Sequence, residues 1–183
     1  MAQQYPELSA KQISFIQAQN LYFVGTATDD SRVNISPKGI DSLRVLDANR
    51  VVWLNMTGSG NETSAHVQLS PRMTIMFAAF EGSPMILRLY GKARVIHQND
   101  AEWNALYAKF PPTPGARQIF DLDIDLVQTS CGMGVPFYDY VGERNQLDKW
   151  AEKKVDSQLL EYWAEKNHSS IDGLPTHIVE KNS

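Results

Sequence analysis

The chain has 183 residues, of which 43% are hydrophobic, enough to build one sizeable core. Its 17 basic and 21 acidic residues give a formal charge of −4, whereas nucleic-acid-binding proteins normally show a clustered basic excess. The single cysteine excludes an intrachain disulfide framework and cysteine-rich zinc modules, and no apolar stretch approaches the length of a membrane span. We therefore expect a cytoplasmic protein of one domain, residues 1–183, that binds neither nucleic acid nor membrane.

Turn residues and apolar spacing divide the first half of the chain into five elements. Ser9 and Gln12 form a capping box, so a helix begins after Ser9. Strands are predicted where aromatic and β-branched residues gather, and a turn at residues 29–31 joins two of them in a hairpin. In chain order we expect a helix over residues 10–20, strands over 22–28, 32–36 and 51–55, and a helix over 62–69.

The second half contains the clearest strand of the chain. Residues 85–95 alternate apolar and polar side chains, which is typical of a half-buried strand. Trp103, Leu106 and Phe110 have helical spacing and predict a helix that ends before Pro111. The other predicted elements are strands over residues 73–80 and 120–126 and helices over about 146–154 and 157–166.

The order of these elements favours a β-rich architecture. Few strands are separated by a crossover helix, which disfavours a doubly wound parallel sheet. Roughly six strands, two of them continuous apolar runs, predict a closed or nearly closed antiparallel barrel. Helices flank this barrel, and a helical tail covers about residues 145–183.

Two charged stripes of opposite sign follow predicted strands. If the strands pair, the stripes face each other across the sheet, where each pair contributes roughly 0.2–1 kcal/mol. We favour this structural role over a basic substrate site or a metal site. The stripes are Arg88, Lys92 and Arg94 on one strand and Asp121, Asp123 and Asp125 on the other.

A glycine-rich loop over residues 57–61 leads into a predicted helix. Glycines let a phosphate approach the backbone, and the free N–H groups at a helix start point toward it. Asn61, Thr63 and Ser64 would add side-chain donors in the same turn. The alternative is an ordinary Gly/Ser turn with Asn61 as a helix cap.

The segment over residues 34–39 interrupts a strand with Pro37 and places Lys38 just beyond it. A lysine there could pair with a phosphate or with a carbonyl that gains electron density. The alternative is a surface turn.

The histidines and the cysteine show no metal or nucleophile pattern. The four histidines are scattered without metal-ligand spacing, so no zinc or iron site is expected. Cys131 lies in a glycine-rich segment, residues 130–136, with no histidine arranged beside it in the sequence. A loop that packs flat against a ligand is favoured over a catalytic thiol.

Three segments, residues 34–39, 60–65 and 87–93, together resemble the FMN-binding split barrel of the pyridoxamine 5′-phosphate oxidase-related proteins. The resemblance covers about residues 8–130, and the tail is similar to one branch of that superfamily. It implies a mainly β (α+β) fold, an antiparallel six-stranded split β-barrel with flanking helices. It also implies a homodimer with two FMN sites at its interface, each lined by both chains.

The resemblance further implies which residues contact FMN. One set would lie along the isoalloxazine edge, a second would hold the 5′-phosphate, and a third would contact the ring. In that order the sets are Ser36, Pro37 and Lys38; Asn61, Thr63 and Ser64; and Ser130, Cys131 and Gly132.

The chain departs from true pyridoxamine 5′-phosphate oxidases, which carry an Arg-Lys pair in the phosphate helix and an arginine-rich C-terminal motif. Here the helix begins Asn61-Glu62, and residues 176–183 contain no arginine. We therefore expect a flavin-dependent oxidoreductase of another small molecule, in which the protein orients the flavin and tunes its charge. The alternatives are a non-catalytic flavin-binding or sensor module, or the same barrel binding a deazaflavin or haem, with His66 or His177 as axial ligand.

Overall fold

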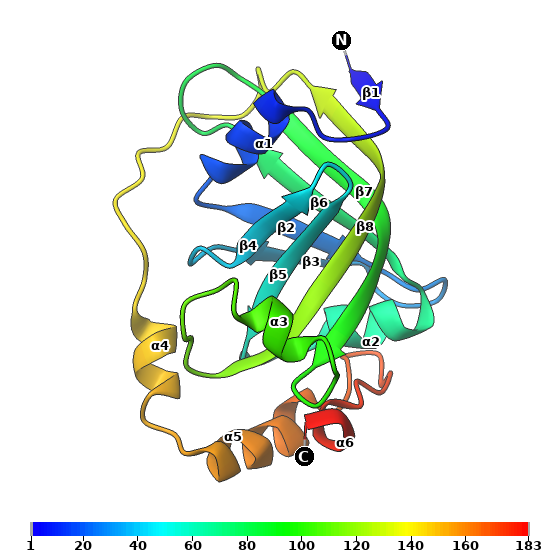
Figure 1. The fold of residues 1–183 in the computed structure, drawn as a ribbon, viewed down its shortest axis with the longest axis vertical. Coiled ribbons are helices and arrows are strands. Elements are labelled where there is room, and N and C mark those ends of the chain that lie inside the picture. The colour runs from blue at the N-terminus through cyan, green and yellow to red at the C-terminus, as the bar shows by residue number, and fades with distance from the viewer. Residues whose placement is uncertain (1, 183) are drawn as a thin grey trace.

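The computed structural model describes residues 2–182, in which helices surround an antiparallel sheet (Figure 1). The strands are β1 (Gln3–Tyr5), β2 (Tyr22–Thr26), β3 (Asn34–Lys38), β4 (Leu43–Asp47), β5 (Arg50–Met56), β6 (Arg72–Ala78), β7 (Ile86–His97) and β8 (Ala116–Ser130). The helices are α1 (Ala10–Gln17), α2 (Glu62–Leu69), α3 (Trp103–Tyr107), α4 (Gln146–Ala151), α5 (Asp156–Tyr162), the π-helix η1 (Trp163–Asn167) and α6 (Ile178–Asn182). None of the helices in this part of the chain is long and apolar enough to cross a membrane.

The sheet is open rather than closed. Its strands follow the order β3-β2-β6-β7-β8-β5-β4, with β1 added to β8, and the end strands β3 and β4 are not paired with each other within residues 2–182. The expected mainly β, antiparallel fold with flanking helices is confirmed, but the expected six-stranded, closed or nearly closed barrel is wrong: the sheet has eight strands and is not closed. The sequence pattern does not predict β1 or β4, because β1 has three residues and every residue of β4 is at least partly exposed.

Most of the other predicted elements are present. Helix α1 has the predicted capping box, in which the Gln12 side chain accepts from the backbone N–H of Ser9 at 2.8 Å. Helix α2 has the predicted bounds. The last predicted helix is divided between α5 and η1, and α6 is an additional short helix that the pattern does not predict.

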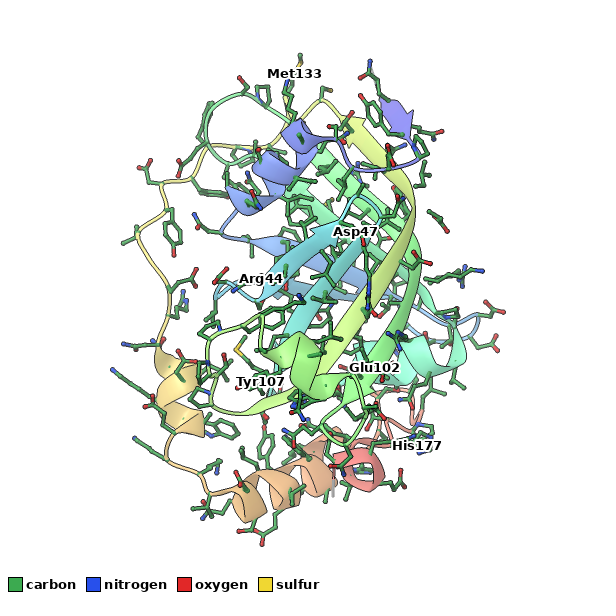
Figure 2. The ribbon with its side chains drawn as sticks, viewed as in Figure 1. Arg44, Asp47, Glu102, Tyr107, Met133 and His177 are labelled. Atoms are coloured by element: carbon green, nitrogen blue, oxygen red, sulfur yellow. The ribbon has the colours of Figure 1, made fainter. Side chains whose placement is uncertain are left out.

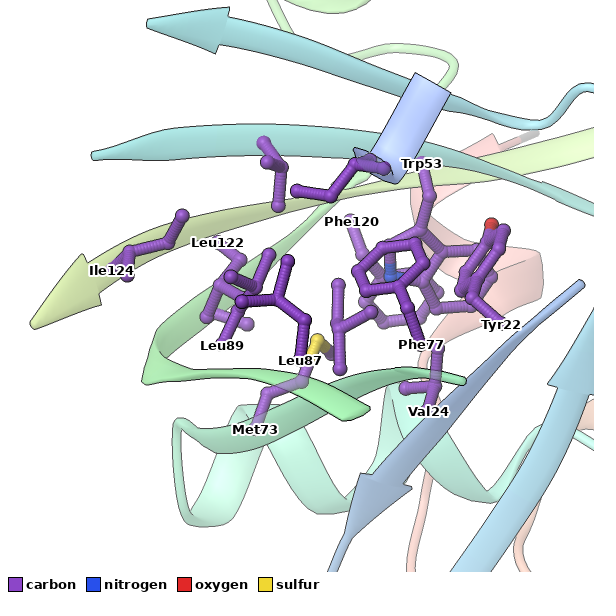
Figure 3. Packing of buried hydrophobic residues seen from close by; sticks show 14 of the residues in the cluster. Tyr22, Val24, Trp53, Met73, Phe77, Leu87, Leu89, Phe120, Leu122 and Ile124 are labelled. Atoms are coloured by element: carbon purple, nitrogen blue, oxygen red, sulfur yellow. The ribbon is translucent and has the colours of Figure 1, made fainter. Parts of the chain in front are cut away.

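The main core lies inside the curved sheet (Figure 3). Trp53 of β5 and Phe120 of β8 are fully buried there and stack at a centroid distance of 4.5 Å. The opposite face of β8 is also covered, because Ile119 packs into a second cluster with Trp103 and Leu106 of α3. Burial of both faces explains why β8 carries a nearly continuous buried run.

The charged stripes meet across β7 and β8, as predicted. Arg94 is opposite Asp121, and the two side chains form an ion pair at 2.9 Å. Lys92 is opposite Asp123. The pairing register shifts between Tyr90 and Gly91, so Asp125 has no opposite residue. The strands approach closely at this shift, because a Cβ at Gly91 would lie 1.9 Å from the Asp123 carbonyl oxygen. The third expected pair is therefore absent.

We predict a measurable coupling between Arg94 and Asp121. Asp121 is 5% exposed and also accepts from Arg50, but the Arg94 side chain is 53% exposed, so solvent screens the pair. A double-mutant cycle with Arg94→Met and Asp121→Asn should give a coupling free energy of about 0.5–1 kcal/mol in urea unfolding. The same cycle on the exposed pair Arg72 and Asp29 is the control and should give a value near zero. Equal values for both pairs would contradict the prediction.

The C-terminal helix α6 is attached to the end of β7 through buried polar groups. The Asn182 side-chain oxygen accepts from the backbone N–H of Gln98 at 2.7 Å, and its amide nitrogen lies 3.3 Å from His97 Nδ1. His97 is 2% exposed, and burial lowers its pKa to about 4. The neutral imidazole is therefore the form that the folded chain accommodates.

Acid should weaken this attachment. The unfolded chain binds a proton at His97 near pH 6.5, whereas the folded chain resists it down to about pH 4, so stability falls as the pH drops through this window. His97 should account for about 2–3 kcal/mol of the loss between pH 7.5 and 4.5. Urea unfolding at both pH values should show a smaller loss for His97→Gln than for the unmodified chain. Identical losses would rule out this role for His97.

Candidate functional site

Strand β3 presents a row of polar side chains toward α2. Alternation along the strand places Asn34, Ser36 and Lys38 on one side, whereas Ile35 and Pro37 point to the other, more exposed side. Asn34 Nδ2 donates to Thr63 Oγ1 at 3.1 Å, and Ser36 Oγ donates to Asn34 Oδ1 at 3.3 Å. The structure thus brings the sequence candidates Ser36, Lys38 and Thr63 to one side of β3 and separates Pro37 from them.

Lys38 is the only cation in this row, and it has no acceptor. Its ammonium lies 5.1 Å from the centroid of the Trp53 ring, and no hydrogen bond or ion pair joins its side chain to any residue between 2 and 182. Burial is the main cause that lowers the pKa of Lys38 to about 8, and the Arg117 guanidinium lowers it further. The Glu62 carboxylate acts in the opposite direction. At neutral pH, Lys38 is therefore a partly buried ammonium without an ion-pair partner in residues 2–182, and it can receive an anionic group.

Two of the three expected phosphate ligands form side-chain hydrogen bonds to a distant part of the same chain. Asn61 and Ser64 are buried at the start of α2, and Asn61 makes no side-chain cap hydrogen bond to this helix. Asn61 Nδ2 instead donates to the backbone oxygen of Asn167, and Ser64 Oγ donates to that of Thr176, each at 3.4 Å. Both side chains therefore face the C-terminal part of the chain, leaving Thr63 as the expected phosphate ligand on the β3 side.

Residues 163–177, which we call the strap, cover the loop 57–61 and the start of α2 (Figure 1). The strap makes four further contacts with these and neighbouring segments. They are Trp163 Nε1 to Thr57 Oγ1 at 2.9 Å, Asn167 Nδ2 to the Gly58 oxygen at 2.9 Å, the Ile171 N–H to Glu62 Oε1 at 3.3 Å, and an ion pair of Asp172 with Arg32. The predicted anion loop is thus covered by a distant segment of its own chain.

Arg117 lies beneath this loop and was not among the sequence candidates. It is 3% exposed, and its guanidinium donates to Asn167 Oδ1 and to the Gly60 oxygen, both at 2.7 Å. Within the described chain it has no carboxylate at ion-pair distance, and burial lowers its pKa to about 10. The one sequence signal is its position directly before an apolar strand run, where a charged side chain must be either exposed or specifically paired.

Ser130, Cys131 and Gly132 lie at the other end of β8. Ser130 is 13 positions after Arg117, which corresponds to roughly 40 Å along a strand. Ser130 Oγ accepts from Arg88 at 3.2 Å, Cys131 is exposed, and Gly132 packs closely on the backbone of Met85. The neighbouring Met133 and the strap residue His177 mark opposite ends of the molecule in Figure 2. Within one chain, these candidates are not joined to the row on β3.

The exposed side of β3 borders a groove of about 570 Å³ on the outer face of the sheet. Apolar side chains of β2, β3 and β6 line it together with Arg88 and Tyr90 of β7. Val33 and Ile35 are more than two-thirds exposed, which is unusual for large apolar residues at a sheet edge.

Comparison with known proteins decides the family. The model of the family Pyridoxamine 5′-phosphate oxidase matches residues 8–131. The pyridoxamine 5′-phosphate oxidase family protein ustO of Aspergillus flavus is 37% identical over 190 residues, covering 93% of this chain and 76% of that protein. The chain belongs to the pyridoxamine 5′-phosphate oxidase family.

Solved structures of low identity share the fold. A proposed pyridoxamine 5′-phosphate oxidase from Lactobacillus delbrueckii aligns with a TM-score of 0.54 and 22% identity, over 67% of this chain and 94% of its own. A pyridoxamine 5′-phosphate oxidase-related, FMN-binding protein from Nostoc punctiforme aligns with a TM-score of 0.51 and 15% identity, over 70% of this chain and 87% of its own. The family match ends at residue 131, so the strap lies outside the matched domain.

Removal of the Lys38 charge should stabilise the protein. Because its folded pKa lies below its unfolded value, the unfolded chain holds the proton more tightly, and stability rises with pH between about 8 and 10.4. Lys38→Met keeps most of the apolar stem and should raise the unfolding free energy by about 1–2 kcal/mol at pH 7. The difference should shrink as the pH approaches 10.

Urea unfolding between pH 7 and 10 measures this effect, with Lys149→Met at an exposed position as the control. A Lys38→Met variant that is less stable than the unmodified chain at pH 7 would show that the ammonium has a favourable partner.

Proposed function

We propose that this protein binds FMN and uses it as an oxidoreductase of a small molecule. The observation that carries the proposal is the row on β3, which ends in the unpaired ammonium of Lys38 and begins beside Thr63 at the start of α2. Membership of the family and the fold shared with an FMN-binding protein of Nostoc punctiforme support this choice of cofactor.

The residues in this row fit the parts of a flavin mononucleotide. Ser36 and Lys38 would lie along the ring edge, where an ammonium stabilises negative charge on the ring. The Thr63 hydroxyl and the first N–H groups of α2 would hold the phosphate. We assign Asn61 and Ser64 to support of this turn, because their side chains bond to the strap. When bound, FMN supplies the hydride chemistry at its N5 atom.

We also propose that the protein is a homodimer. The groove beside β3 is lined by apolar side chains together with Arg72, Arg88 and Asp125, and the exposed Val33 and Ile35 are among its lining residues. A second copy packed on this face would cover the β3 edge and bring its own segment 130–132 toward the flavin. This arrangement gives Ser130, Cys131 and Gly132 a role that they do not have within one chain.

The haem alternative finds little support in the histidines. His66 is fully buried, with its Nδ1 3.2 Å from Thr26 Oγ1, and His177 is bonded to Glu180 at 2.8 Å. A non-catalytic flavin-binding or sensor role would use the same residues as the enzyme, so only reactivity distinguishes the two.

The freshly purified protein should show the visible absorption of bound oxidised flavin, or should acquire it when FMN is added and the excess removed. Lys38→Ala and Thr63→Ala should each weaken FMN binding by about tenfold, because each removes a hydrogen-bonding or charged partner of the cofactor. Lys149→Ala, at an exposed position, is the control.

Bleaching by NADH or NADPH with turnover would support the enzyme, and flavin that resists every reductant would identify a binding module instead. A colourless protein that does not retain added FMN would contradict the proposal.

A further inference from the structure

Another cavity lies toward the end of the molecule where helix α1, the β6–β7 loop and the segment after β8 meet (Figure 1). It has a volume of about 750 Å³, which is within the range of small-molecule sites. It shares a single lining residue, Phe23, with the groove beside β3. Neither Lys38 nor Thr63 lines it, so the cavity is separate from the residues to which we assign FMN.

Four aromatic rings line this cavity. They are Phe23 of β2, Phe80 just after β6, and Tyr138 and Tyr140 of the segment after β8. The rings of Phe80 and Tyr138 pack at a centroid distance of 5.5 Å, and the Tyr138 N–H donates to the Phe80 oxygen at 3.1 Å. These contacts hold the segment after β8 against the β6–β7 loop. Because the faces of aromatic rings carry negative electrostatic potential, such a lining attracts an ammonium group.

The charged side chains that line the cavity are acidic. Glu81 and Asp139 each follow one of the two packed rings directly in the chain, and both are exposed. No lysine, arginine or histidine between residues 2 and 182 lines the cavity, and neither carboxylate has an ion-pair partner in this part of the chain. A third carboxylate, that of Glu143, accepts from the hydroxyl of Tyr140 at 2.9 Å. The lining therefore combines apolar rings with unpaired negative charge.

We propose that this cavity binds a cationic ligand, in which an ammonium group carries apolar or aromatic substituents. The rings would contact the substituents and face the positive charge, and the two carboxylates would favour a cation over a neutral or anionic molecule. Solvent screens both exposed carboxylates, so the rings contribute the larger part of the selectivity. The proposal goes beyond the proposed function, because it uses none of the residues assigned to FMN and requires no flavin.

The test is isothermal titration calorimetry of the full chain at constant chloride concentration. Choline and its neutral carbon analogue dimethylbutanol, in which a carbon atom replaces the nitrogen, form a pair of the same shape that differs in charge. Choline should bind about fivefold more tightly than dimethylbutanol, because the rings and the carboxylates act on its charge. Benzyltrimethylammonium should bind more tightly than choline, because its ring adds apolar contact with the lining.

Replacement of one ring tests the aromatic lining. Tyr138→Leu should weaken the binding of benzyltrimethylammonium about fivefold. Tyr138 is 63% exposed, so its replacement should leave the fold intact. Phe137→Leu is the matched control and should leave binding unchanged, because the neighbouring Phe137 is 79% exposed and does not line the cavity.

Neutralisation of the carboxylates tests the charge. The double variant Glu81→Gln with Asp139→Asn should lower the preference for choline over dimethylbutanol about threefold. The double variant Glu152→Gln with Glu161→Gln removes the same charge at exposed positions outside the cavity and should keep the full preference.

Equal binding of choline and dimethylbutanol would overturn the proposal, as would equal losses in Tyr138→Leu and Phe137→Leu. The absence of binding by all three probes would also overturn it, and this is the result expected if a second copy of the chain covers the cavity.

Discussion

The candidate site depends on one buried guanidinium that joins three distant parts of the chain. Arg117 belongs to β8, contacts the loop 57–61 through Gly60, and contacts the strap through Asn167. A buried arginine requires all of its neighbours to be placed correctly, because each unmet donor inside the protein is costly. Arg117 thus ties the loop before α2 and the strap to β8, and Thr63 at the start of α2 is in turn bonded to Asn34 of β3.

The sequence predicts those features of the fold that depend on residues close together in the chain or on alternation along a strand. The capping box at Ser9, the bounds of α2 and the pairing of Arg94 with Asp121 all follow from spacing along the chain or alternation along a strand. The open sheet edge and β4 do not follow in this way, because they depend on which strands meet and not on what each strand contains. The resemblance implies the correct family, but the sheet has eight strands instead of the six expected, and it is not closed as the strand pattern suggested.

Local sequence patterns predict only part of the candidate site. Ser36 and Lys38 share one side of β3 with Asn34, which bonds to Thr63, and both the alternation along β3 and the start of α2 are visible in the sequence. The contacts of Asn61 with Asn167 and of Ser64 with Thr176 span more than 100 residues, and no spacing rule connects such positions. The role of Arg117 cannot be predicted from spacing for the same reason, since its partners lie on a loop and a strap that are far from it in the chain.

The segment that covers α2 lies outside the matched family domain. The domain ends at residue 131, and the segment that covers α2 arrives only after the chain has returned along the whole length of the molecule (Figure 1). The strap residues at this end of the candidate site therefore lie outside the matched domain, whereas most of the sheet lies within it. A substitution in the strap would therefore change the surroundings of α2 without changing any residue of the matched domain, whereas the similarity to the Aspergillus flavus protein extends over 93% of this chain.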